Sequence, residues 1–290
     1  MSLTIQNLSK TYPNGVHALQ GINLNIPAGM FGLLGPNGAG KSSLMRTIAT
    51  LQDPDTGSIS FHGSNVLQDK TGLRRQLGYL PQEFDVYPKT SALDLLDYIA
   101  QLKGIANGRE RKELVERLLT LTNLHDVRKK AVATYSGGMK QRFGIAQALI
   151  GDPKLMIVDE PTAGLDPEER VRFHNLLADI SSDVTVILST HIVSDVSDLC
   201  QNFAIINKGQ VLAQTTPKEA LASLRGRIWE KRMPRGRQDE PVPIELISMH
   251  LSMGDQVMRL YGKDWSATGA TPTEPTLEDF YFASIKGLVL

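Results

Sequence analysis

The sequence predicts an α/β fold with a mainly parallel sheet, and the placement of its apolar runs supports that prediction. Two runs, Leu155–Val158 and Val184–Leu188, are short, uninterrupted and bounded by polar residues, which is typical of strands buried on both faces. A third run, Met30–Leu34, leads into a glycine-rich turn and then into a segment with helical apolar spacing. Strands that alternate with helices in this way belong to the α/β class.

The remaining elements of the first half follow in chain order. Up to residue 27, apolar side chains recur at period two, which predicts antiparallel strands. These side chains are Leu3, Ile5, Ile22, Leu24 and Ile26. Two helical faces are predicted next, one directly after the glycine-rich turn and one within the mostly helical residues from about 90 to 150. Their apolar members are Leu44, Ile48 and Leu51 for the first face, and Leu114, Leu118 and Leu121 for the second.

A further helix is predicted between the two buried strands. Asp166 is a capping residue, Pro167 suits the first helical position, and Glu169 follows three residues after the cap. The expected buried face of this helix comprises Phe173, Leu176, Leu177 and Ile180.

The composition of the sequence changes near residue 222, where a small C-terminal module is predicted to begin. The stretches Arg225–Pro243 and Lys263–Pro275 are polar or rich in Pro and Gly, as linkers are. Between them, apolar residues within 257–261 give a weak strand signal, and Thr276–Asp279 opens a short helix.

Composition excludes several classes of protein. The 290 residues carry 31 Lys+Arg and 31 Asp+Glu, a balance that disfavours a nucleic-acid partner because such proteins are usually basic. Cys200 is the single cysteine, so a disulfide framework within the chain is excluded. We expect no segment that crosses a membrane and no signal peptide, since no apolar run approaches 18 residues and the first six residues lack a basic and an apolar region.

One motif predicts phosphate binding. Gly35–Ser42 matches the pattern G-x-x-x-x-G-K-[ST] at every fixed position, and it lies between a predicted strand and a predicted helix. Its glycines let backbone N–H groups approach phosphate oxygens closely. Lys41 would bridge the β and γ phosphates, and the Ser42 hydroxyl would bind Mg²⁺. A chance turn is the alternative, which the strand–loop–helix context disfavours.

Two acids end the buried strand at Leu155–Val158. Ligands gather at the carboxyl ends of strands in open α/β sheets, so Asp159 and Glu160 should face the phosphate loop. Asp159 can hold Mg²⁺, and Glu160 can orient and deprotonate an attacking water. Two solvated loop acids are the alternative.

A second turn could also bind an anion. Tyr135–Met139 contains Ser-Gly-Gly and precedes a helix expected at Lys140–Ile150, where free N–H groups and the positive end of the helix dipole meet. Taken alone, this turn is better explained as a helix cap with permissive glycines. Because the chain already contains one predicted phosphate loop, we instead favour a second anion-binding turn here.

In order and spacing, these motifs resemble those of the nucleotide-binding subunits of ATP-binding cassette (ABC) transporters over about residues 1–220. The resemblance implies an ABC-type P-loop NTPase domain at 1–221 with a mainly parallel sheet core and an antiparallel N-terminal β subdomain. It also implies a helical subdomain at about 85–150 and, beyond the cassette, a small C-terminal α+β module at 222–290.

The resemblance assigns roles to further residues. Gln82 falls in the glutamine loop, Asp166 in the D-loop, and His191 is the switch histidine. Tyr12 would stack on adenine. Each has a plain alternative: Tyr12 as a hairpin aromatic, Gln82 as a surface amide and His191 as a satisfied core histidine.

The expected site residues can now be grouped by role. The catalytic residues are Glu160, His191, Gln82 and Lys41. The nucleotide-binding residues are Tyr12, Gly35, Pro36, Asn37, Gly38, Ala39, Gly40, Lys41, Ser42 and Ser43. The signature residues, which would act on the nucleotide of a second subunit, are Ser136, Gly137 and Gly138, and the D-loop residue is Asp166. The Mg²⁺ ligands are Ser42, Gln82 and, through water, Asp159.

The implied function is ATP hydrolysis, with ATP and Mg²⁺ as cofactors, that powers a separate transmembrane permease from the cytoplasmic face of the cell membrane. Two nucleotide-binding subunits would pair head to tail, as a homodimer or a heterodimer. Tyr135 and Met139 replace the usual Leu and Gln of the signature, and together with Pro275–Tyr281 they are similar to A-subfamily exporters. The cargo stays unassigned, because the permease would recognise it.

Two alternatives are weighed against this function. A soluble ABC ATPase acting on ribosomes or DNA would carry two cassettes or long coiled coils, and neither is found here. A P-loop GTPase would need Asn-Lys-x-Asp, whereas Asn207–Gln210 lacks the aspartate.

Overall fold

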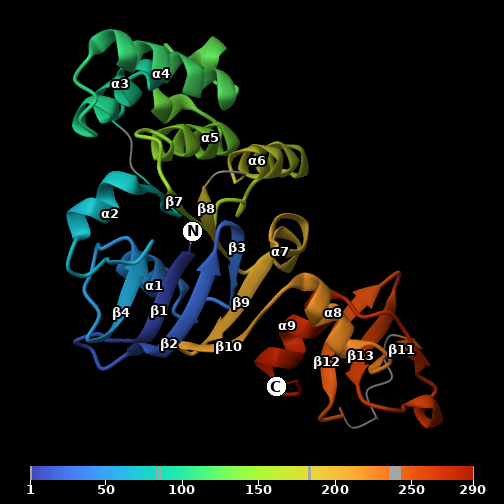
Figure 1. The fold of residues 1–290 in the computed structure, drawn as a ribbon. Coiled ribbons are helices and arrows are strands. Elements are labelled where there is room, and N and C mark those ends of the chain that lie inside the picture. The colour runs from blue at the N-terminus through green and yellow to red at the C-terminus, as the bar shows by residue number, and fades with distance from the viewer. Residues whose placement is uncertain (1, 83, 85–86, 182–183, 235–242, 290) are drawn as a thin grey trace.

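The structure is a computed structural model that describes residues 2–82, 84, 87–181, 184–234 and 243–289 (Figure 1). Its central sheet has the order β10-β9-β3-β8-β7-β6. The strands of this sheet are β3 (Gly29–Leu34), β6 (Leu77–Leu80), β7 (Leu155–Asp159), β8 (Thr185–Thr190), β9 (Asn202–Asn207) and β10 (Gln210–Thr215). All neighbouring pairs are parallel except β9 with β10, so the mainly parallel sheet is confirmed.

Both faces of the central sheet are covered, which explains its uninterrupted apolar runs. The covering helices are α1 (Lys41–Ile48), α5 (Gly137–Ala148), α6 (Pro167–Ile180) and α7 (Val193–Leu199). Alternate residues of each strand point to opposite faces of the sheet. Met156 and Val158 of β7 pack with residues of α5, α6 and α7, whereas Leu155 and Ile157 pack with residues of α1 and of a second, N-terminal sheet.

The N-terminal sheet is antiparallel, as predicted. Its order is β2-β1-β4-β5, with β1 at Ser2–Thr11, β2 at His17–Pro27, β4 at Thr56–Phe61 and β5 at Ser64–Asn65. Leu3 lies opposite Ile26 and Ile5 opposite Leu24, so the period-two side chains share one buried face. Helix α2 (Lys70–Gln76) leads from this sheet to β6.

The helical segment lies apart from the N-terminal sheet (Figure 1). It contains α3 (Ala92–Leu102), α4 (Gly108–Leu121), α5 and two short 3₁₀ turns, η1 (His125–Val127) and η2 (Val132–Thr134). These elements share an apolar core of their own, formed by side chains that include Leu96, Leu119 and Phe143.

Two predicted helical faces were wrong in detail. Helix α1 ends at Ile48, because Thr50 adopts a left-handed φ of 59° that turns the chain, and Leu51 is 61% exposed rather than on the helix face. In α4, Leu118 is buried as expected, but Leu121 is 46% exposed because Val115 completes the face that packs on α3 and α5.

The predicted helix Lys140–Ile150 begins earlier, at Gly137, and ends at Ala148, because Ser136 caps it. The helix after Asp166 is confirmed as α6, with Asp166 accepting a hydrogen bond from the Glu169 N–H. On α6, Phe173, Leu176 and Leu177 are buried, and Ile180 is partly buried.

The C-terminal elements form a third sheet of order β12-β13-β11-β14. They are α8 (Pro217–Leu224), β11 (Ile228–Pro234), β12 (Leu246–Ser252), β13 (Asp255–Tyr261), η3 (Ser266–Thr268), β14 (Thr271–Pro272) and α9 (Leu277–Ile285). The expected strand within 257–261 and the helix after Thr276 are therefore confirmed. The stretch Arg225–Pro243 is not only a linker, since β11 occupies part of it; residues 235–242 lie outside the described part.

The third sheet and the central sheet share one continuous apolar core. Phe280 of α9 packs edge to face on Phe203 of β9, with ring centroids 6.1 Å apart. One buried apolar cluster joins α7 and β9 to α8, α9 and the third sheet. No helix in the described ranges is both long and apolar enough to cross a membrane.

A buried ion pair joins β13 to α9. The Arg259 Nε donates to Asp279 Oδ1 at 3.0 Å, and this hydrogen bond raises the pKa of Arg259 above its ordinary value. Asp279 also accepts the Thr276 N–H at 2.8 Å in the α9 capping box. Removing either charge would leave the other buried and uncompensated.

Asp279→Asn should therefore lower the free energy of unfolding by about 3 kcal/mol, the lower end of what breaking a buried pair costs. Urea denaturation followed by circular dichroism measures this change. Asp152→Asn is the matched control, because Asp152 pairs with Lys154 at the surface and its loss should cost less than about 1 kcal/mol. Equal effects of the two variants would contradict the structural role of the buried pair.

Candidate nucleotide-binding site

The phosphate loop connects β3 to α1 at the carboxyl edge of the central sheet. Two of its glycines are required by close backbone packing. A Cβ at Gly35 would lie 2.3 Å from the Ile206 carbonyl oxygen, and a Cβ at Gly40 would lie 2.5 Å from the Ala18 carbonyl oxygen. Gly40 also has a φ of 107° and places no side chain over the N-terminus of α1, so the first N–H groups of α1 face the loop.

Lys41 lies inside the loop that precedes it. Its buried ammonium donates to the carbonyl oxygens of Gly35 at 2.6 Å and Pro36 at 3.3 Å. It also lies 3.2 Å from Glu160 Oε1, across from the end of β7. This geometry places a fixed positive charge where a phosphate held by the loop would lie.

Glu160 and His191 come together because β7 and β8 are parallel neighbours. Glu160 follows β7 with a left-handed φ of 49°, and its N–H donates to the Ser189 carbonyl at 2.8 Å. His191 follows β8, and its Nδ1 lies 2.7 Å from Glu160 Oε2. Lys41, Glu160 and His191 thus form a continuous chain of charged and polar contacts, and the Glu160 carboxylate has a partner on each oxygen.

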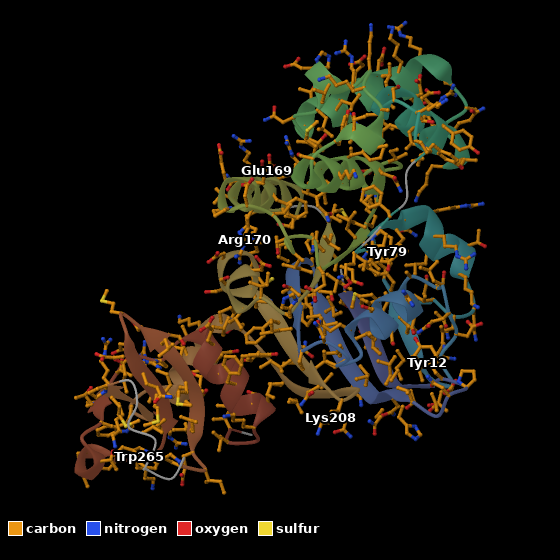
Figure 2. The ribbon with its side chains drawn as sticks, turned by 180° about the vertical axis from the view of Figure 1, so that it is seen from behind. Tyr12, Tyr79, Glu169, Arg170, Lys208 and Trp265 are labelled. Atoms are coloured by element: carbon orange, nitrogen blue, oxygen red, sulfur yellow. The ribbon has the colours of Figure 1, made fainter. Side chains whose placement is uncertain are left out.

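These residues line a cavity of about 440 Å³, a size typical of small-molecule sites. Its lining comprises Tyr12, Val16, His17, Ala18, Gln20, Pro36–Ser43, Gln82, Glu160, His191 and Lys208. The Tyr12 hydroxyl donates to Gln52 Oε1 at 3.0 Å and lies 3.1 Å from Ser43 Oγ, which fixes the ring at the edge of the cavity. Figure 2 shows Tyr12 and Lys208 on the same side of the molecule, near the N-terminal sheet.

Asp159 lies behind this cavity rather than in its lining. Its side chain is buried, and its Oδ1 has no hydrogen-bond partner within the described residues. Burial and the charge of Asp159 both raise the pKa of nearby Tyr79. An unpaired buried carboxylate oxygen at the end of β7 suits the donor set that a hard divalent cation prefers.

The signature turn lies elsewhere. The Ser136 side chain accepts the Met139 N–H at 3.2 Å as the cap of α5, and Gly138 packs so closely on α6 that a Cβ would lie 2.4 Å from Glu169 Oε2. Tyr135, which replaces the usual Leu, is buried and donates its hydroxyl to the Val127 carbonyl at 3.0 Å. None of these residues lines the cavity.

The structure therefore divides the predicted site into two groups. It brings Tyr12, the phosphate loop from Pro36 onward, Gln82, Glu160 and His191 to one cavity, whereas Gly35 does not line it. It places Ser136, Gly137, Gly138 and the D-loop cap Asp166 at the adjoining starts of α5 and α6. The roles assigned to the individual residues stay predictions.

Sequence reasoning missed five lining residues: Val16, His17, Ala18, Gln20 and Lys208. Lys208 stands at the tip of the β9–β10 hairpin, and its carbonyl accepts Gln20 Nε2 at 2.7 Å across 188 residues of sequence. His17, to which the sequence assigns no role, lies at the start of β2 and bonds Thr11 through Nδ1 at 3.0 Å. Only the Lys208–Gly209 turn gives a local signal, since these contacts join distant segments.

Comparison with known proteins decides the family. Residues 19–163 match the family described as ABC transporter, and the chain is 35% identical over 234 residues to the daunorubicin/doxorubicin resistance ATP-binding protein DrrA of Streptomyces peucetius. That match covers 80% of this chain and 70% of DrrA. The chain belongs to the ABC transporter family.

Further relatives agree. The methionine import ATP-binding protein MetN of Bordetella pertussis is 38% identical over 77% of this chain and 64% of MetN. The dimeric structure of MJ0796, a bacterial ABC transporter cassette, superposes with a TM-score of 0.67 at 26% identity, covering 74% of this chain and 98% of that cassette. MJ0796 has also been solved in a post-hydrolysis state bound to ADP and Pi. The predictions of an ABC-type P-loop fold and of an ATP-binding, ATP-hydrolysing transporter subunit are confirmed.

Gly40→Ala should weaken ATP binding at least about tenfold, which corresponds to 1.4 kcal/mol, because the new methyl group meets the Ala18 carbonyl and displaces the loop. Equilibrium titration with a fluorescent ATP analogue measures this loss. Gly63→Ala is the control: Gly63 also has a positive φ, of 82°, but nothing lies within 4 Å of its Cβ position. Unchanged affinity in Gly40→Ala would show that the loop tolerates the displacement.

Proposed function

We propose that this chain is the ATPase subunit of an ABC exporter and drives a separate transmembrane permease. The observation that carries the proposal is the contact chain Lys41–Glu160–His191 on the phosphate-loop cavity, because it combines anion binding with a base and a hydrogen-bond donor. The ATPase character belongs to the family; the residue roles, the partner and the direction of transport are the proposal.

Catalysis would depend on position and charge rather than on a covalent step. Lys41 and the N–H groups at the start of α1 would hold the β and γ phosphates. Glu160 would accept a proton from the attacking water, and His191 would donate a hydrogen bond to the γ-phosphate. Tyr12 would stack on adenine.

Mg²⁺ fits the residues around Asp159. Ser42 and Gln82 line the cavity, and the unpaired Oδ1 of buried Asp159 could be reached through a water molecule. When bound with ATP, the ion would neutralise phosphate charge.

The divided site supports a head-to-tail pair of subunits. Ser136 and Gly138 stand outside the cavity of their own chain, so a second subunit would supply them to its nucleotide. The dimeric structure of MJ0796 supports this arrangement. The γ-phosphate, held from both sides, would stabilise the closed dimer, and hydrolysis would release it.

Export is favoured over import by two observations. The signature Tyr-Ser-Gly-Gly-Met and the helix opening at Thr276 are similar to A-subfamily exporters, and DrrA is named for drug resistance. Similarity to MetN, which is named for import, makes import the second candidate. In either case the subunit would bind the permease at the cytoplasmic face of the cell membrane.

Two parts of the chain have subsidiary roles in this proposal. The permease would contact the surface near Tyr87, whose side chain is 64% exposed. Nearby Phe84 is not a candidate for this contact, because its ring packs on Phe143 with ring centroids 6.4 Å apart. Residues 222–290 would be an accessory module on a cassette at 1–221, an assignment supported by the separate third sheet.

Glu160→Gln should bind ATP with Mg²⁺ but hydrolyse it at least about 100-fold more slowly, because the general base is lost. It should accumulate as an ATP-dependent dimer on size exclusion, since hydrolysis no longer opens the closed pair. Adding Ser136→Arg should keep ATP binding and abolish that dimer. Wild-type turnover in Glu160→Gln would remove Glu160 from the role of base.

The permease is tested by affinity capture of the tagged chain from detergent-extracted membranes of the source cell. A stoichiometric multi-span partner is expected. Reconstituted with that partner in vesicles, the complex should move cargo away from the side that hydrolyses ATP. Capture of ribosomes or nucleoid would overturn the transporter role, and inward movement would replace export with import.

A further inference from the structure

A second carboxylate, Asp195, is completely buried close behind the catalytic groups. It lies on α7, four residues after His191, and its side chain has 0% relative exposure. Because bulk solvent does not reach this side chain, its charge must be compensated by donors from the protein.

Each carboxylate oxygen of Asp195 has two partners. Oδ2 accepts hydrogen bonds from the hydroxyls of Thr162 at 2.6 Å and Thr190 at 3.2 Å. Oδ1 accepts the Arg170 Nε at 2.9 Å and lies 2.8 Å from His174 Nε2. Arg170, which supplies the permanent positive charge, is a residue of α6 and is labelled near Glu169 in Figure 2.

The partners of Asp195 belong to the segments that carry the proposed chemistry. Thr162 stands two residues after Glu160, and Thr190 stands directly before His191. Both hydroxyls are buried on the same carboxylate oxygen, so the backbone after β7 and the last residue of β8 are held at a fixed separation. Glu160 and His191 project from these two backbones and meet at 2.7 Å.

The remaining two partners of Asp195 connect it to α6, which in turn contacts α5, the helix that begins at the signature turn. Arg170 and His174 lie on α6, and Glu169 of the same helix lies 3.4 Å from Arg142 on α5. Asp166, the D-loop cap, begins α6. One carboxylate therefore joins the base, the switch histidine and the helix that follows the D-loop.

We propose that Asp195 is a positioning residue for ATP hydrolysis: it aligns Glu160 with His191 through Thr162 and Thr190, and it sets the start of α6 relative to both. This inference rests on the proposed roles of Glu160 and His191. Among the described residues, none of the four side chains bonded to Asp195 lines the nucleotide cavity, so Asp195 acts on the geometry of the hydrolytic step and not on nucleotide affinity.

Asp195→Asn tests this role, because the amide keeps the shape of the side chain but loses the charge and one acceptor. We expect kcat to fall about 10- to 100-fold, the loss that a displacement of about 1 Å produces, while the Kd of a non-hydrolysable ATP analogue stays within about twofold. Asp195→Glu, which restores the charge, should recover most of the lost rate.

Two further measurements separate positioning from loss of stability. Asp279→Asn removes another buried carboxylate, one that does not line the cavity, and should lower the melting temperature without lowering kcat. Combined with Glu160→Gln, Asp195→Asn should reduce the residual rate by much less than it does alone, because the alignment of Glu160 no longer matters. Should Asp195→Asn not fold, Thr190→Val removes one of the four contacts and should lower kcat several-fold at unchanged Kd.

The outcomes distinguish this inference from the function on which it rests. Unchanged kcat in folded Asp195→Asn or Thr190→Val, or a loss of nucleotide affinity in place of kcat, overturns the positioning role. Wild-type hydrolysis by Glu160→Gln instead overturns the assignment of the base, whatever Asp195→Asn does.

Discussion

The parallel alignment of β3, β7 and β8 is the constraint from which the candidate site follows. Parallel neighbours end at the same edge of a sheet, so the loops after three strands meet although about 150 residues separate Gly35 from His191 in the sequence. That edge receives the phosphate loop, the acids after β7 and the histidine after β8. Charge compensation completes the arrangement, because Lys41 and Glu160 are both buried and each offsets the cost of burying the other.

Backbone packing gives the site its rigidity. The phosphate loop is held on one side by the Ile206 carbonyl and on another by the Ala18 carbonyl, and at both contacts only a glycine leaves enough room. The β9–β10 hairpin closes the same region, since the Gly209 N–H donates to the Ala39 carbonyl at 2.9 Å. A ligand that binds there meets groups already in position, which favours catalysis by preorganisation.

Local signals in the sequence were enough for strands β1, β2, β3, β7 and β8, for the phosphate loop and for the cap of α6, because each depends on residues a few positions apart. They could not predict where α1 would end, because the left-handed Thr50 is not a residue type that marks a turn. They also missed Lys208 and the partners of Asp195, which are brought together only by tertiary packing. On α4 the predicted face was right for Leu114 and Leu118 but wrong for Leu121, because spacing alone does not show that Val115 and Leu119 complete the packed face.

Helix α7 faces two parts of the molecule at once. One side carries Asp195 toward α6, while Val196 on another side packs into the apolar cluster that contains Phe280 and Leu277 of α9. A Cβ at Gly32 would lie 3.0 Å from Val196, so little space separates this helix from β3. A helix of two turns moves as a rigid body. The apolar cluster therefore couples the position of α7, and with it Asp195, to α9 and the third sheet.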